Sequence, residues 1–78
     1  MGIRKADLND SVDRFVDYDF EEVMFRWEAG SRMIFRKFYG KEEDLVPVDH
    51  TSKLFNDALN FGAEISAVDY ARGKPLKQ

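Results

Sequence analysis

The sequence predicts a small α+β domain in which one or two helices pack on a small antiparallel β-sheet. Three observations lead to this prediction. Two aromatic-rich segments flank a short glycine-containing turn in the middle of the chain, as in a β-hairpin. Apolar residues recur at helical spacing just after the single histidine. A short alternating segment, residues 64–70, follows that helix, and we expect this C-terminal strand to join the central hairpin.

The length and composition indicate one globular domain covering residues 1–78. A chain of 78 residues has room for a single core. Hydrophobic residues make up 44% of it and charged residues 35%, which is an ordinary globular balance. The tail, residues 71–78, contains glycine, proline and basic residues, so we expect it to be frayed.

The hairpin is predicted to pair residues 23–27 with residues 32–39. A three-residue loop with glycine in the left-handed position would place Phe25 opposite Met33. A two-residue loop would place Phe25 opposite Ile34 and scatter the apolar residues over both faces, so we favour the first register. In that register the core face carries Val23, Phe25, Trp27, Met33 and Phe35.

A helix is predicted from about Thr51 to Asn60, with Asp49 or Thr51 as its N-cap. Gly62 follows as the stop signal. We expect this helix to pack on the core face of the hairpin. Its apolar positions are Leu54, Phe55, Ala58, Leu59 and Phe61. Before it, Leu45–Val48 is expected to be extended, because Val46 precedes a proline.

The N-terminal third has two interpretations. Its apolar residues fit one face of a short helix that would give way to an extended entry into the hairpin, which is the interpretation we favour. Residues 16–21 also alternate as a strand would, so a strand there stays open. The helical interpretation depends on Leu8, Val12, Phe15 and Val16.

Charge is distributed in three blocks along a chain with a net charge of −3. Residues 7–22 contain seven acidic residues and one arginine, and residues 42–69 contain seven acidic residues and one lysine. Between them, residues 26–41 contain five basic residues and one glutamate. The second face of the hairpin therefore mixes basic and apolar side chains, the types enriched at interfaces. We predict it to be partner-binding, through Met24, Arg26, Arg32, Ile34, Arg36 and Phe38.

Three coverings of this basic face are open. The acidic N-terminal segment could fold over it, with Asp13, Asp17 or Asp19 pairing the arginines. Another protein or a second copy of the chain could bind it. Nucleic acid is the third alternative, because basic strands interleaved with aromatic residues suit phosphate contact and base stacking. The overall acidity of the chain argues against nucleic acid.

The residues give little basis for catalysis. Cysteine is absent, which excludes disulfides, thiolate metal sites and thiol nucleophiles. His50 stands at the predicted helix start, where we expect a neutral capping neighbour in preference to a metal ligand. We therefore predict no enzyme activity, no catalytic residue, no metal site and no cofactor.

The function predicted from sequence is that of a small non-enzymatic binding module, an inhibitor or adaptor that binds another protein. No apolar run is long enough to span a membrane, and the lack of cysteine favours a reducing compartment, so we expect a cytoplasmic protein. No motif is specific to a known family. A short, plain chain of this kind is typical of accessory proteins of phages and other mobile elements.

Overall fold

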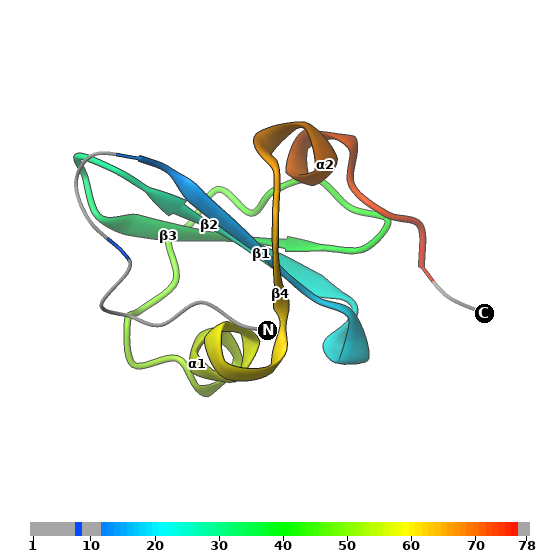
Figure 1. The fold of residues 1–78 in the computed structure, drawn as a ribbon, viewed down its shortest axis with the longest axis horizontal. Coiled ribbons are helices and arrows are strands. Elements are labelled where there is room, and N and C mark those ends of the chain that lie inside the picture. Colours follow the sequence, from blue (N-terminus) through cyan, green and yellow to red (C-terminus); the bar gives the residue numbers. More distant parts are fainter. Residues whose placement is uncertain (1–7, 9–11, 77–78) are drawn as a thin grey trace.

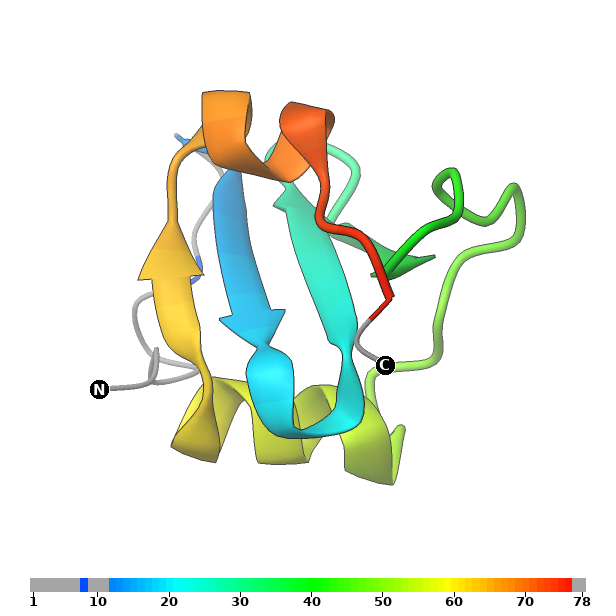
Figure 2. The same ribbon diagram turned by 90° about the vertical axis from the view of Figure 1, so that its right-hand side faces the viewer.

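The computed structural model describes residue 8 and residues 12–76, and within them the fold is α+β, as predicted. A four-stranded antiparallel sheet has the order β3-β2-β1-β4. One helix lies on each face of the sheet, as Figure 1 shows. The same layers are visible in the turned view (Figure 2). The elements are β1 (Arg14–Tyr18), the 3-10 turn η2 (Asp19–Glu21), β2 (Val23–Glu28), β3 (Met33–Phe38), α1 (Lys53–Phe61), β4 (Ala63–Ile65) and α2 (Ala67–Arg72).

The larger core lies between the sheet and α1. The helix buries Phe55, Ala58 and Leu59, and the ring of Phe55 meets that of Phe25 edge-on at 5.4 Å between centroids. Ser52 caps the helix, since its side chain accepts from the Phe55 N–H at 3.3 Å, and the helix ends at Gly62. The helix predicted from about Thr51 to Asn60 is therefore confirmed, but its N-cap is Ser52 and not Asp49 or Thr51. The strands contribute Val16, Tyr18, Val23, Phe25, Trp27 and Ile34.

A smaller core lies on the opposite face of the sheet, beneath α2. Met24, Tyr39 and Tyr70 are buried there, with Phe15 and Ile65 packed against them. Both faces of the central strands are thus covered, which explains why β2 is apolar at positions that alternate to either side. A sheet covered on both faces leaves little of the central hairpin accessible to a partner.

The hairpin register differs from both predicted registers. Arg26 lies opposite Phe35 and Trp27 opposite Ile34, so four residues, 29–32, form the loop. Arg32 has a positive φ of 61°, and the sequence gives no signal for that at an arginine. As a result Ile34 joins the larger core, whereas Met33 is 45% exposed.

The N-terminal segment forms a strand where we favoured a helix. Residues 14–18 are β1, with Phe15 and Val16 on opposite faces of the sheet. Leu8, Val12 and Asp13 are non-helical, and residues 9–11 lie outside the described residues. β1 occupies a central position between β2 and β4, so its backbone groups are paired on both sides.

The C-terminal segment is a strand only over Ala63–Ile65, and α2 replaces the rest of the expected strand. Ser66 starts α2 by accepting from the Asp69 N–H at 3.0 Å. Residues 71 and 72 belong to α2, and the Gly40 N–H donates to the Lys74 carbonyl at 2.7 Å. Of the tail that we expect to be frayed, residues 71 and 72 are thus helical and residues 73–76 have no regular secondary structure, while residues 77 and 78 lie outside the described part. No helix among the described residues is both long and apolar enough to cross a membrane.

Candidate partner-binding surface

The six residues predicted from sequence do not share one surface. Met24 and Ile34 are both completely buried, on opposite faces of the sheet. Arg26 and Arg36 also point to opposite faces, because residues directly across the hairpin share a face and Arg26 pairs with Phe35, while Arg36 pairs with Phe25. The single basic face depended on the predicted register and is absent in the observed one.

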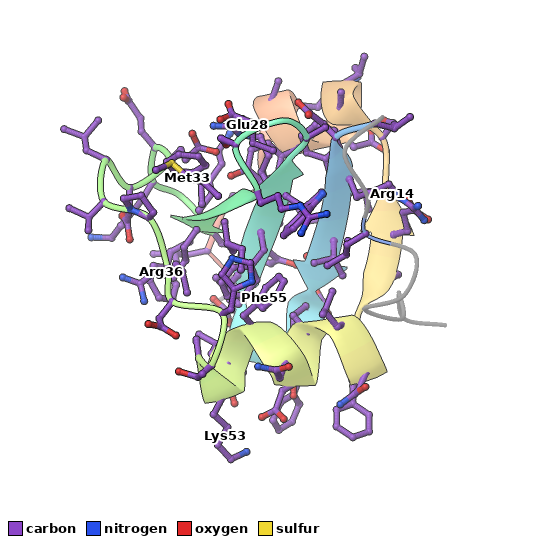
Figure 3. The ribbon with its side chains drawn as sticks, turned by 90° about the vertical axis from the view of Figure 1, so that its left-hand side faces the viewer. Arg14, Glu28, Met33, Arg36, Lys53 and Phe55 are labelled. Carbon is purple, nitrogen blue, oxygen red and sulfur yellow. The ribbon has the colours of Figure 1, made fainter. Side chains whose placement is uncertain are left out.

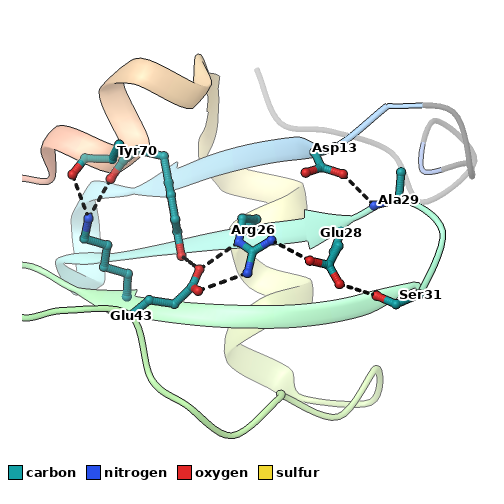
Figure 4. A network of polar contacts seen from close by, with 9 residues as sticks. Asp13, Arg26, Glu28, Ala29, Ser31, Glu43 and Tyr70 are labelled. Atoms are coloured by element: carbon teal, nitrogen blue, oxygen red, sulfur yellow. Dashed lines mark hydrogen bonds and ion pairs between the residues drawn. The ribbon is translucent and has the colours of Figure 1, made fainter.

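Arg26 is held in a network of its own chain (Figure 4). Its Nε and Nη2 donate to the two carboxylate oxygens of Glu43 at 2.9 and 3.0 Å, a bidentate pair. Its Nη1 donates to Glu28 at 3.0 Å, and its guanidinium lies 4.5 Å from the Phe35 ring centroid. The side chain is only 21% exposed. Arg26 therefore joins β2 to the segment after β3.

Two further contacts complete the surroundings of Glu43. The Tyr70 hydroxyl donates to the same carboxylate, and the Lys37 ammonium donates to the Tyr70 carbonyl at 2.8 Å. Hydrogen bonding from Arg26 is the largest influence on Glu43 and lowers the pKa of its carboxyl group. Burial raises the pKa of the Tyr70 hydroxyl, and the hydrogen bond to Glu43 raises it further. The network thus stabilises an ionised Glu43 beneath α2.

Arg36 and Phe38 lie together near the outer edge of the sheet. Arg36 donates to Asp44 at 2.9 Å, and its guanidinium lies 5.0 Å from the Phe38 ring centroid. Both members of the ion pair are more than a third exposed, so its contribution to stability is small. Figure 3 shows Arg36 and Met33 on one side of the molecule and Arg14 on the opposite side.

Arg32 lies in the hairpin loop, and its carbonyl is 3.0 Å from the His50 Nε2. The imidazole meets the Trp27 ring edge-on at 5.7 Å between centroids. Arg32, Trp27 and His50 line a hollow of about 220 Å³ together with Leu8 and Phe55. His50 therefore contributes to packing. Among the described residues, no group of three metal-ligating side chains comes together.

Arg26 and Arg36 each pair with an acid of the second acidic block, and Arg26 pairs with Glu28 as well. The acids of the second block are Glu43 and Asp44, whereas the alternative left open from sequence named Asp13, Asp17 or Asp19. Asp13 accepts from the Ala29 N–H at 2.7 Å. Asp17, 6% exposed, accepts from the Tyr39 hydroxyl and from the Lys74 ammonium, both at 2.6 Å.

The segment that joins β3 to α1, residues 39–52, carries an exposed apolar pair that the sequence analysis did not identify as a site. We call it the connector. Leu45 is 95% exposed, and Val46, the next residue, is 74% exposed. The connector returns along β3, and the Val48 N–H donates to the Ile34 carbonyl at 2.7 Å. Two adjacent apolar residues before a proline, in a loop of this length, were the available signal.

Comparisons with known proteins agree on one family. The family model described as Tis1 immunity protein matches residues 1–74. The immune protein Tis1 of Pseudomonas aeruginosa (strain UCBPP-PA14) is 44% identical over 75 residues, which cover 96% of this chain and 97% of that protein. The crystal structure of the complex between the Type VI effector Tas1 and its immunity protein contains a chain that matches with a TM-score of 0.92 and 43% identity, over 96% of this chain and 99% of that one. The chain belongs to the Tis1 immunity protein family.

Proposed function

We propose that this protein is the immunity protein of a Type VI effector related to Tas1, and that it neutralises the effector by binding it. One observation carries the proposal. A chain in the complex of Tas1 with its immunity protein shares this fold at a TM-score of 0.92 and is matched over 99% of its length. No large insertion or deletion separates the two chains, so a surface used by one is available on the other.

The architecture of the described residues suits a stoichiometric binder. Both faces of the sheet are covered, and the buried side-chain nitrogen and oxygen atoms all have hydrogen-bond partners. Two of the three arginines predicted for the basic face, Arg26 and Arg36, are engaged with carboxylates of the same chain. These contacts favour a protein partner, and the comparisons give nucleic acid no support. Inhibition by occupancy requires no turnover, which agrees with a non-enzymatic role.

Co-production in bacteria tests the proposal. Tas1, and any Tas1-related effector found in the organism of this chain, would each be induced with and without the protein. We expect restored growth with at least one of them and a 1:1 complex in size-exclusion chromatography that survives nuclease treatment. Unrestored growth and no complex with either effector would contradict the proposal.

The protein is proposed to act in the cytoplasm. The absence of cysteine makes the fold independent of an oxidising compartment. Cell fractionation of a strain that produces the untagged protein checks this, with the cytoplasmic fraction as the expected location. A phage or mobile-element origin stays a prediction.

A further inference from the structure

The connector is built as a presented loop. Loops of more than about 12 residues without secondary structure are uncommon in small domains and are usually functional. This one carries Leu45, the most exposed large apolar residue among those described, next to Val46 and Pro47, which are also exposed. Two adjacent aliphatic side chains left in water cost free energy that a partner can recover by covering them.

The main chain of the connector is fixed on either side of this apolar tip. Before it, the Asp44 N–H donates to the Arg36 carbonyl at 2.8 Å, and the Asp44 carboxylate pairs with the Arg36 guanidinium. After it, Val48 donates to the Ile34 carbonyl, and the Thr51 N–H and hydroxyl both donate to Asp49. A loop already held in shape loses less conformational entropy on binding.

The same contacts determine how a partner can approach. β3 is an edge strand, and edge strands commonly recruit partners by main-chain pairing. Here the main-chain carbonyls of Ile34 and Arg36 accept hydrogen bonds from N–H groups of the connector. The Arg32 carbonyl lies within hydrogen-bonding distance of the His50 side chain. The connector therefore covers this edge. A partner at this side must therefore contact side chains of the connector. Figure 2 shows the connector standing out beyond β3, away from β4.

The charge around the tip defines the chemistry of that partner. Glu42 and Asp49 flank it, both exposed, and neither forms an ion pair within the described part of the chain. The hydrogen bonds from Thr51 lower the pKa of the Asp49 carboxyl group, so it is ionised at neutral pH. Glu43 and Asp44 lie between them, paired with arginines. An apolar tip with an acidic rim complements an apolar hollow rimmed by lysine or arginine.

We propose that Leu45 and Val46 insert into an apolar hollow with a basic rim on the effector, so that the connector forms the centre of the interface. This inference rests on the proposed function and specifies the surface that performs it. Central, well-desolvated apolar contacts dominate interface affinity. Glu42 and Asp49 provide electrostatic steering toward the basic rim, which acts mainly on the association rate.

A double variant, Leu45→Ser with Val46→Ser, tests the surface. Its affinity for the effector that the wild-type protein binds would be measured by biolayer interferometry, and its stability by urea unfolding. We expect binding to weaken by about 100-fold, with an unchanged urea midpoint because both side chains are exposed. The matched controls, Phe61→Ser and Val68→Ser, remove exposed apolar residues from α1 and α2 and should change affinity by less than about threefold.

A loss of less than about tenfold in the double variant overturns the inference, as does an equal loss in both controls. Glu42→Lys supplies an independent readout. This variant should associate with the effector more slowly than the wild type does, and its association rate should depend less steeply on salt concentration. The control Glu21→Lys, on η2, should associate at the wild-type rate. If the association rate of Glu42→Lys equals that of the wild type, the effector has no basic rim facing Glu42. Failure of the wild-type protein to bind would instead contradict the proposed function itself.

Discussion

At the scale of single residues, Glu43 connects three parts of the structure that are far apart in the sequence. Its carboxylate accepts from two nitrogens of Arg26 and from the Tyr70 hydroxyl, and so connects β2, the connector and α2. An acid of the same chain as the partner of Arg26 was one alternative that the sequence left open. The sequence could not indicate which acid, since Glu43 is 17 residues away and reaches Arg26 only because the connector turns back along β3.

The depressed pKa of Glu43 predicts a pH-dependent contribution to stability. A carboxyl group whose folded-state pKa lies below its unfolded value of 4.5 stabilises the fold fully above that value and loses the effect as pH falls through the folded pKa. We therefore expect Glu43→Gln to be less stable than the wild type by about 1–2 kcal/mol at pH 7. The difference should narrow below about pH 4.5.

Urea unfolding between pH 7 and pH 3 measures this difference. Glu42→Gln is the matched control, because the neighbouring carboxylate is exposed and without an ion pair in the described part of the chain. Its stability should follow the wild-type curve throughout. Parallel curves for Glu43→Gln and the wild type would show that Arg26 does not hold Glu43 in its ionised form.

At the scale of elements, a long run of apolar residues at helical spacing predicted a helix correctly, whereas short segments did not reveal whether they form a helix or a strand. Helix α1 has several apolar residues on one face and matched its prediction closely. Its last apolar residue, Phe61, was wrongly included in the core and is 73% exposed. Helix α2 has only six residues, fewer than two turns, so its apolar spacing could not be told from a strand. The hairpin existed as predicted, but its register depended on the conformation of Arg32.

Gly62 and Gly30 illustrate two different requirements for glycine. Gly62 has an ordinary negative φ, yet a Cβ there would lie 2.6 Å from the Ala58 carbonyl oxygen and 2.7 Å from that of Asp17. Both atoms are main chain, so neither can move without separating α1 from β1. Gly30 has a φ of +88° and open space around it. The sequence identified Gly30 as a turn residue and Gly62 as the stop signal of the helix, but it could not reveal the close approach at Gly62.

These surroundings predict unequal costs for the same substitution. Gly62→Ala should lower the free energy of unfolding by about 3 kcal/mol, because it forces overpacking against two carbonyls. Gly30→Ala should cost about 1 kcal/mol, from backbone conformation alone. Chemical unfolding of both variants measures the difference. Equal costs would mean that the end of α1 can shift away from β1.

At the scale of the whole molecule, charge pattern and topology act together. Pairing of the basic centre with acids of the same chain was one of three alternatives that the charge blocks left open, and Arg26 and Arg36 form such pairs. Each has a partner from the C-terminal block because the connector and α2 lie over the hairpin, while β1 is built into the sheet. The binding surface we propose could not be inferred, because Leu45 and Val46 stand out only once the connector is seen fixed along β3.

The last described residues link the C-terminal segment to the sheet. The Lys74 ammonium donates to Asp17 of β1 at 2.6 Å, and the Asp17 side chain is only 7% exposed. Asp17 also accepts from the buried Tyr39 hydroxyl. The Gly40 N–H donates to the Lys74 carbonyl, and a Cβ placed on Gly40 would lie 3.2 Å from the Leu76 side chain. Removing Lys74 would therefore leave a buried carboxylate without its cation.

A chain shortened to end at Gly73 should consequently be less stable than the full chain by about 2 kcal/mol. Breaking a buried ion pair from one side leaves an uncompensated charge, and the cost is reduced here because Lys74 is 47% exposed. A chain ending at Leu76 keeps Lys74 and is the matched control, with the stability of the full chain. Urea unfolding at pH 7 compares the three. If the shorter chain unfolds at the same urea midpoint as the full chain, water must stabilise the Asp17 carboxylate as effectively as the Lys74 ammonium does.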